Sequence, residues 1–186
     1  MPNKADNATK INIAIRQGRL DDAPHLKRIA RQAYRQYVPR MPKPPAPMLA
    51  DYAKLLAGAD ADIDADVAAD IIVLVAETTD ETTASLGDAS VGGGRRGVVG
   101  FAIILKKSDG YWLENVAVGD GWRGQGIGGR LLGAVEEALA GKAESYQLYT
   151  NAVMTENIGW YRRLGFEDLG QRDDEGYSRV FFRKRL

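Results

Sequence analysis

Cysteine is absent from the 186-residue chain, and histidine occurs once, at His25. The lack of thiols excludes disulfide bonds, a thiol nucleophile and thiolate metal sites. A single imidazole also argues against histidine catalysis and against metal sites built from several histidines. The sequence therefore favours a protein that works without a metal.

Long hydrophobic runs and an excess of either charge are also missing. The longest aliphatic run, residues 71–76, is far too short to cross a bilayer, and the polar residues 1–10 lack the apolar stretch of a signal peptide. The formal net charge is +0. Despite a basic end at residues 179–185, this balance indicates neither nucleic-acid nor membrane-surface binding. We expect a soluble, cytoplasmic protein.

Two polar stretches look functional at first sight. Aspartates alternate between residues 60 and 66 as in a calcium loop, but an EF-hand requires glycine and glutamate where Ala65 and Ile71 stand. We therefore predict a solvated acidic loop. Residues 78–97, rich in Thr, Asp, Ser and Gly, join two expected strands, and we predict a mobile hairpin tip there instead of a linker between domains.

The spacing of apolar residues switches between two and about 3.6, which predicts a mixed sheet with helices. Alternation of isoleucines over residues 11–15 predicts a first strand, followed by a helix that Asp21 or Asp22 can cap and that Pro39 ends. Residues 39–47 hold five prolines, which predicts a stiff loop that is neither helix nor central strand. A second helix is expected over residues 48–56.

Six further strands are predicted from apolar and alternating runs. They cover residues 71–77, 98–107, 111–118, 146–150, 166–171 and 177–184. With 45% hydrophobic residues, the chain can bury one sizeable core. We therefore predict a disordered tail at residues 1–10 and a single domain over residues 11–186.

The most informative segment, residues 114–132, runs from an apolar strand through a glycine-rich turn into a helix. Gly124, Gly126, Gly128 and Gly129 remove side chains where the backbone must come close to a ligand. The N–H groups of the first helical turn have no partner within the helix and attract anions. Four glycines exceed what a plain turn requires, so the segment predicts a phosphate or pyrophosphate site.

Two nucleotide-binding interpretations of this loop are weak. Gly124-x-Gly126-x-x-Gly129 satisfies the dinucleotide fingerprint, but that fold requires an acid about 20 positions further on, and residues 149–151 contain none. A Walker loop requires lysine and a hydroxyl residue after its glycines, whereas residues 130–131 are Arg-Leu.

The third interpretation takes Arg123-x-x-Gly126-x-Gly128, directly after the strand that ends at residue 118, as a pyrophosphate loop for coenzyme A. Here the chain resembles the GNAT superfamily of N-acetyltransferases. The central motif of that family is a strand, then Arg/Gln-x-x-Gly-x-Gly/Ala, then a helix whose amino end carries the pyrophosphate of acetyl-CoA. A second segment similar to the family follows at residues 155–167.

The resemblance covers roughly residues 11–186 and implies an α/β (α+β) fold of the GNAT type. That fold has a mixed, mostly antiparallel central sheet of about seven strands, flanked by about four helices. The implied enzyme is an N-acetyltransferase that moves the acetyl group of acetyl-CoA to a primary amine of a small molecule or peptide, without a metal. A homodimer is implied by resemblance alone. The alternatives are a non-catalytic acetyl-CoA sensor module and, less favoured, a nucleotide-binding protein.

The resemblance also implies catalytic roles. Acids on the strand before the loop often serve the family as general base, and Glu114 is the only acid in residues 111–118. A structural glutamate at a strand edge is the competing interpretation. The backbone N–H of Val116 would polarise the thioester carbonyl, and Tyr161 would give a proton to the departing thiolate or hydrogen-bond the sulfur.

The implied cofactor-binding residues come from the strand end, the loop and the short helix of the second segment. They are Val116, Ala117, Val118, Arg123, Gly124, Gln125, Gly126, Ile127, Gly128, Asn157 and Tyr161. The acceptor side is expected where the first helix meets the proline-rich loop, at Tyr34, Tyr37 and Arg40. Aromatic rings and one guanidinium suit an amine that also carries a carboxylate or an apolar body. A structural loop with a solvated arginine is the alternative.

Overall fold

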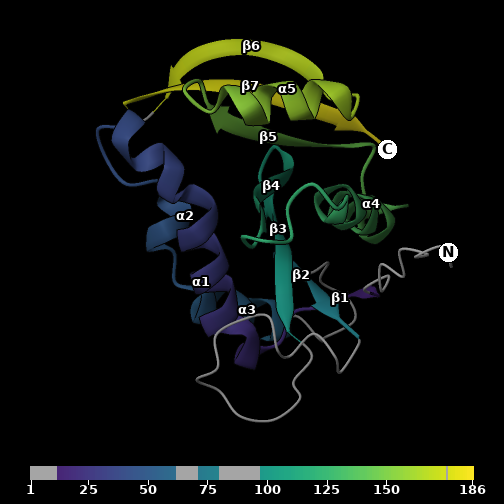
Figure 1. Ribbon diagram of the computed structural model, residues 1–186. Helices are drawn as coiled ribbons and strands as arrows, with labels where there is room; N and C mark the ends of the chain where they lie inside the picture. Colours follow the sequence, from purple (N-terminus) through teal and green to yellow (C-terminus); the bar gives the residue numbers. More distant parts are fainter. Residues whose placement is uncertain (1–11, 62–70, 80–96, 175) are drawn as a thin grey trace, which may run out of the picture.

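The computed structural model describes residues 12–61, 71–79, 97–174 and 176–186. In these residues, seven strands form one sheet in the order β1-β2-β3-β4-β5-β7-β6 (Figure 1). The strands are β1 Ile13–Gln17, β2 Ile71–Thr78, β3 Val98–Lys107, β4 Gly110–Val118, β5 Ser145–Asn151, β6 Glu167–Asp174 and β7 Tyr177–Arg185. The tail expected at residues 1–10, residues 62–66 of the acidic loop and most of the expected hairpin tip lie outside the described residues.

Five α-helices and two 3₁₀ helices accompany these strands in the described ranges. They are η1 Leu20–Asp22, α1 Ala23–Tyr34, η2 Arg35–Arg40, α2 Ala46–Leu49, α3 Tyr52–Ala61, α4 Ile127–Leu139 and α5 Thr155–Arg163. All strand pairs are antiparallel except β4 with β5, which is parallel. The predicted fold class, a mixed and mostly antiparallel sheet of seven strands with flanking helices, is confirmed. No helix among the described residues is long and apolar enough to span a membrane.

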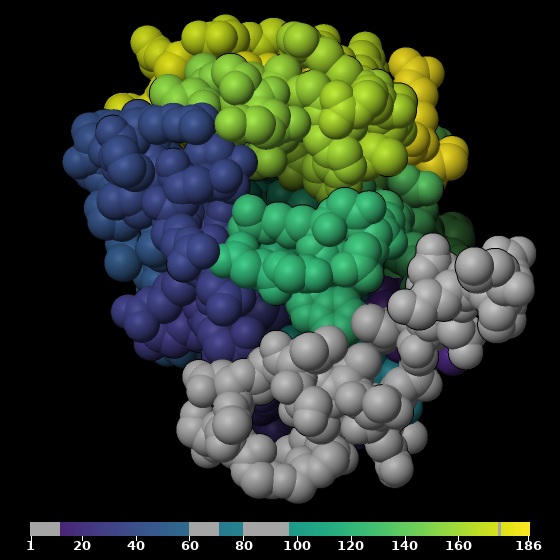
Figure 2. Space-filling model, in the orientation of Figure 1, coloured from purple at the N-terminus to yellow at the C-terminus, as the bar shows by residue number. Residues whose placement is uncertain are grey.

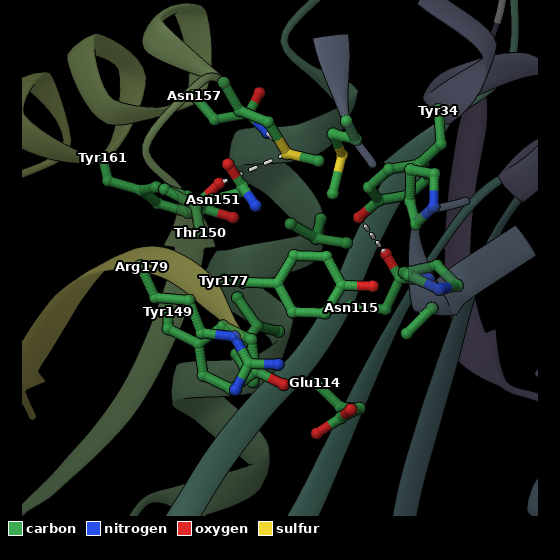
Figure 3. Close-up of a pocket in the computed structure, with 17 residues that line it drawn as sticks. Tyr34, Glu114, Asn115, Tyr149, Thr150, Asn151, Asn157, Tyr161, Tyr177 and Arg179 are labelled. Carbon is green, nitrogen blue, oxygen red and sulfur yellow. Dashed lines mark hydrogen bonds between the residues drawn. The ribbon is translucent and has the colours of Figure 1, made fainter. Parts of the chain in front are cut away.

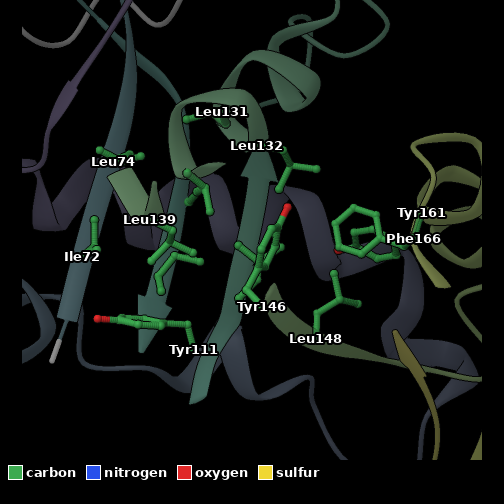
Figure 4. Packing of buried hydrophobic residues seen from close by; sticks show 14 of the residues in the cluster. Ile72, Leu74, Tyr111, Leu131, Leu132, Leu139, Tyr146, Leu148, Tyr161 and Phe166 are labelled. Carbon is green, nitrogen blue, oxygen red and sulfur yellow. The ribbon is translucent and has the colours of Figure 1, made fainter. Parts of the chain in front are cut away.

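Both faces of the central strands are covered, which explains the continuous apolar run in β2. Ile72 and Leu74 belong to the core under α4, whereas Val73 and Val75 pack with α1 and α3. A strand that is buried on both faces needs apolar residues at every position. Figure 4 shows the α4 side of this core, where leucines of α4 meet aromatic rings from β4 and β5.

The proline-rich region differs from the sequence prediction. The first helix does not run to Pro39, because α1 ends at Tyr34 and continues as the 3₁₀ helix η2, which contains Pro39. The expected second helix is divided in two at the extended residue Ala50. Asp51 explains the new start, since its carboxylate accepts a hydrogen bond from the Lys54 backbone N–H at 3.1 Å, as an N-capping side chain does.

Two irregularities of β4 create the space for a site. Parallel pairing with β5 is confined to Tyr111 with Tyr146 and Trp112 with Gln147, so the two strands separate beyond that point. On the other edge, Ile103 pairs with Asn115 and Ile104 with Leu113. Glu114 is therefore the extra residue of a β-bulge. Bulges bend a strand and re-aim its side chains.

Candidate active site

The loop between β4 and α4 has the geometry of an anion site. Gly126 is the N-cap of α4 with φ 77°, a left-handed conformation that glycine adopts without steric cost. The first helical bond is donated by the Arg130 N–H to the Gly126 carbonyl at 3.1 Å. Among the described residues, no acceptor is recorded for the N–H groups of Ile127, Gly128 and Gly129, so these donors are available to an anionic ligand.

A cavity lies against these N–H groups, and we call it the loop cavity. It encloses about 1220 Å³ of space that is partly open to solvent. Its walls are the end of α1, β4, the glycine-rich loop and α5; characteristic lining residues are Tyr37, Val118, Gly126, Gly129, Asn157 and Trp160. Figure 2 shows the start of α4 exposed on this face, between α1 and α5. A long ligand with a phosphate group fits this shape and chemistry.

A second cavity, which we call the strand cavity, opens where β4 and β5 separate (Figure 3). It encloses about 700 Å³, again partly open to solvent. Its walls come from β4, β5, β7, α5 and residues 41–47. Tyr34, Val116 and Asn157 line both cavities. The two cavities therefore adjoin at Val116.

Tyr161 projects from α5 into the strand cavity, one helical turn after Asn157 (Figure 3). It is 7% exposed, and its ring packs against those of Phe166 and Phe182 at centroid distances of 5.3 and 5.6 Å. Burial raises the pKa of the Tyr161 hydroxyl, because an apolar environment disfavours the phenolate. The hydroxyl thus stays protonated at neutral pH and can act as a donor.

A chain of hydrogen bonds fixes the wall opposite Tyr161. The Tyr34 hydroxyl donates to Asn115 Oδ1 at 2.8 Å, and Asn115 Nδ2 donates to the Tyr52 hydroxyl at 3.2 Å. Tyr52 in turn donates to the Pro47 carbonyl at 2.7 Å. Burial raises the pKa of Tyr34 well above its ordinary value, so this hydroxyl also remains a donor. The proline-rich wall is thereby tied to β4.

Charged side chains from two strands line the strand cavity. Glu114 lies at the bulge of β4, and Lys107 Nζ contacts its carboxylate at 3.4 Å. Arg179 of β7 is 8% exposed, and its guanidinium carbon lies 4.1 Å from the centroid of the Tyr149 ring. Asp174 on β6 accepts a hydrogen bond from Arg179 Nη1.

Most predicted cofactor residues line a cavity, and a few do not. Val116, Val118, Arg123, Gly124, Gly126, Ile127, Gly128 and Asn157 line the loop cavity, whereas Tyr161 lines the strand cavity, as does Glu114, the predicted general base. Ala117 faces the α1 side of the sheet. The side chain of Gln125 turns back and donates to the Gly121 carbonyl at 3.0 Å. Neither residue belongs to the lining of either cavity.

The predicted acceptor residues lie side by side, with ring centroids of Tyr34 and Tyr37 6.3 Å apart and the Arg40 guanidinium carbon 5.8 Å from the Tyr37 ring, but they do not all line the cavities. Tyr34 lines both cavities, and Tyr37 lines the loop cavity, where its hydroxyl donates to Asn157 Oδ1 at 3.4 Å. Arg40 lines neither cavity. Its guanidinium forms an exposed ion pair with Glu156, a lining residue of the loop cavity, at 3.1 Å.

Several lining residues were missed by sequence reasoning. Trp160 lines the loop cavity three residues after Asn157, and the i, i+3 spacing on a helix could have indicated it. Tyr149 and Arg179 line the strand cavity from β5 and β7. The signal for Arg179 was a charged residue within an apolar strand. No group of three or more potential metal ligands occurs among the described residues.

Comparison with known proteins agrees with this geometry. The family model "Acetyltransferase (GNAT) domain" matches residues 70–168, more than half of the chain. The chain belongs to the GNAT acetyltransferase family. This GNAT domain includes β4, the glycine-rich loop, α4 and α5. Comparison with the sequences of curated proteins returns no match.

Solved structures show how widely this GNAT fold is shared. The PaiA N-acetyltransferase from Thermoplasma acidophilum, in complex with coenzyme A, aligns with a TM-score of 0.68 and 16% identity over 94% of this chain and 99% of that one. The ribosomal-protein-S18-alanine N-acetyltransferase from Escherichia coli aligns with a TM-score of 0.62 and 16% identity over 94% of each chain. At this identity the likeness establishes the fold.

Proposed function

We propose that this GNAT acetyltransferase transfers the acetyl group of acetyl-CoA to a primary amine that binds in the strand cavity. The observation that carries the proposal is the junction of the two cavities at Val116. One side offers the free N–H groups of α4 and suits a pyrophosphate. The other side offers Glu114 and the protonated Tyr161. A homodimer in the cytoplasm belongs to the same proposal and rests on resemblance and composition alone.

The loop cavity would hold the co-substrate. The N–H groups at the start of α4 would bind the pyrophosphate, with Arg123 beside them, and Asn157 would bond the pantetheine arm. The edge of β4 at residues 116–118 lies beyond the pairing with β5, which lets an extended ligand add to it like a strand. Acetyl-CoA supplies a thioester whose carbonyl carbon accepts the amine nitrogen.

The residues of the strand cavity would carry out the proton transfers of the reaction. An alkyl ammonium has a pKa near 10, so it must lose a proton before it can attack. Glu114 would take that proton and pass it to solvent. The Val116 N–H would stabilise the oxyanion that develops on the carbonyl. As the carbon–sulfur bond breaks, Tyr161 would donate to sulfur and recover the second proton from nitrogen, which leaves an amide and a thiol.

The raised pKa of Tyr161 refines its proposed role. A phenol that is a weaker acid than usual loses its proton to a thiolate less readily, since each unit of pKa difference corresponds to about 1.36 kcal/mol. A hydrogen bond from Tyr161 to the sulfur is therefore favoured over complete proton transfer before the carbon–sulfur bond breaks. The presence of both Glu114 and Tyr161 in one cavity supports turnover over a purely sensing role.

A ligand-binding experiment tests the cofactor site. A Cβ at Gly129 or at Gly133 would meet no atom within 4 Å, and both glycines lie on α4, but only Gly129 lines the loop cavity. We expect acetyl-CoA at a hundred times its Kd to stabilise the wild-type protein by about 2.7 kcal/mol. The thermal shift should persist in Gly133→Leu and disappear in Gly129→Leu, because the added side chain blocks the ligand.

NADH and ATP serve as controls for the alternative classes. Both should shift the melting temperature much less than acetyl-CoA, because the loop lacks the dinucleotide acid and the Walker lysine. A larger shift with either nucleotide, or an equal acetyl-CoA shift in the two leucine variants, would contradict the assignment of the loop cavity to acetyl-CoA.

A further inference from the structure

The charge of the strand cavity is distributed in a way that selects an acceptor. Of the described residues that line it, Glu114 and Arg179 are the two that carry charge. The remaining lining residues are aromatic, aliphatic, sulfur-containing or neutral polar side chains. Figure 3 shows Glu114 and Arg179 on the same side of the cavity, with the Tyr177 ring beside them. A ligand there meets one carboxylate and one guanidinium.

Arg179 is held firmly on this wall. Its guanidinium carbon lies 4.1 Å from the ring centroid of Tyr149 and 5.5 Å from that of Tyr177. Asp174 accepts a hydrogen bond from Nη1. A guanidinium has five N–H donors in a planar fork and can hold several partners at once. The two rings and Asp174 therefore fix the position of the guanidinium in the wall of the strand cavity.

We propose that the acceptor is a free amino acid, whose amine is directed to Glu114 and whose carboxylate pairs with Arg179. This inference rests on the proposed function, because the amine must reach the cavity junction at Val116. A zwitterion complements both charges of the wall. The body of the ligand would contact Met41, Leu113 and Met154, which favours an apolar or aromatic side chain.

The same wall disfavours two other classes of amine. A polyamine would bring a second ammonium group near Arg179, where the nearest acid, Asp174, is already paired with the guanidinium and does not line the strand cavity. The amino terminus of a peptide carries an amide where the free amino acid carries its carboxylate. The bidentate, charge-assisted hydrogen bonds between a carboxylate and Arg179 would then be lost.

The main test compares phenylalanine and leucine with their own amides, so that each pair differs at the carboxyl group. Spermidine and a C-terminally amidated dipeptide are assayed beside them, with CoA release as the readout. We expect kcat/KM to be roughly ten- to a hundredfold higher for each amino acid than for its amide, through a lower KM. An amide that matches its amino acid, or a preference for spermidine or the dipeptide, overturns the inference.

Matched variants of β7 test whether Arg179 causes the preference for an acceptor with a carboxylate. Arg179→Gln should raise the KM of the amino acid by roughly ten- to a hundredfold and leave the amide nearly unchanged. Arg183→Gln changes the same residue type on the same face of the strand, outside both cavities, and should affect neither acceptor. Arg179→Lys should not restore the wild-type KM of the amino acid, because an ammonium lacks the planar arrangement of donors of a guanidinium.

The outcomes separate this inference from the proposed function. Turnover of the amide by Arg179→Gln shows that the variant is folded and binds acetyl-CoA. If Arg179→Gln loses both acceptors equally, Arg179 is structural and the inference is wrong. If acetyl-CoA fails to stabilise even the wild-type protein, the proposed function itself is wrong.

Discussion

Tyr161 occupies two environments at once, since its ring belongs to the core and its side chain reaches the strand cavity. The Tyr161→Phe variant keeps the ring and removes only the hydroxyl. We expect kcat to fall by about 10²–10⁴-fold, the usual range for a proton-transfer group. The thermal shift with acetyl-CoA should be nearly unchanged, because the proposed pyrophosphate site lies at the start of α4. An unchanged kcat would remove Tyr161 from the proton-transfer step.

Glu114 is the residue that the β-bulge adds to β4, and its carboxylate lines the strand cavity. The Glu114→Gln variant should lose most activity at neutral pH, by about 10²–10⁴-fold, because the acceptor is then almost wholly protonated. Raising the pH should partly restore the rate, since more acceptor is already neutral. Wild-type rates across the pH range would mean that another group or solvent takes the proton.

At the level of elements, the strands were the easiest part to predict. Alternating or continuous apolar runs gave the ranges of β3 and β7 to within one residue at each end, because burial imposes a period of two on each face of a strand. The glycine-rich start of α4 was equally clear, since its backbone requires left-handed residues. These features depend on local sequence.

The helices around the prolines were less predictable, for reasons that are also local. Prolines at 39 and 47 were expected to exclude helix, but a 3₁₀ helix contains the first and α2 contains the second in its first turn. Proline lacks an N–H that the first turn of a helix does not use. The capping role of Asp51, which divides the expected second helix, was overlooked.

The wall of the strand cavity could not be predicted from sequence because it depends on contacts between distant segments. Arg40 was favoured since it follows Tyr34 and Tyr37 closely in the chain, yet it does not line the strand cavity and pairs with Glu156 beside the loop cavity. Arg179 reaches the strand cavity only because β7 pairs with β5, with Asn151 opposite Arg179. Pairing of strands so far apart in sequence leaves no local signal.

At the scale of the whole molecule, one ionic network connects the start of the sheet to the first helical segment. Arg16 on β1 donates to both carboxylate oxygens of Asp22, at 2.8 and 3.0 Å, and to Glu77 on β2 at 2.8 Å. The Arg19 N–H also donates to Asp22. Burial alone would raise the pKa of Asp22, but the hydrogen bonds from Arg16 and Arg19 outweigh it, so this pKa is lowered.

A lowered folded-state pKa makes the stability that Asp22 contributes dependent on pH. The contribution is fully present above the unfolded-state pKa of about 3.9 and is lost as the pH falls through the folded-state value. We expect Asp22→Asn to lower the free energy of unfolding at neutral pH by about 1.5–3 kcal/mol, the usual range for hydrogen bonds to a charged group. Urea denaturation of wild type and variant between about pH 3 and 8 measures the difference.

The difference between wild type and Asp22→Asn should shrink as the pH falls below about 4, because the wild-type carboxyl then takes up a proton and weakens its bonds to Arg16. Asp21→Asn is the matched control, since Asp21 is the exposed neighbour on the same 3₁₀ helix. Asp21→Asn should lower the free energy of unfolding by less than about 0.5 kcal/mol at any pH. Equal losses in the two variants, or a gap that stays constant in acid, would mean that packing around η1, and not the charge of Asp22, joins this helix to the sheet.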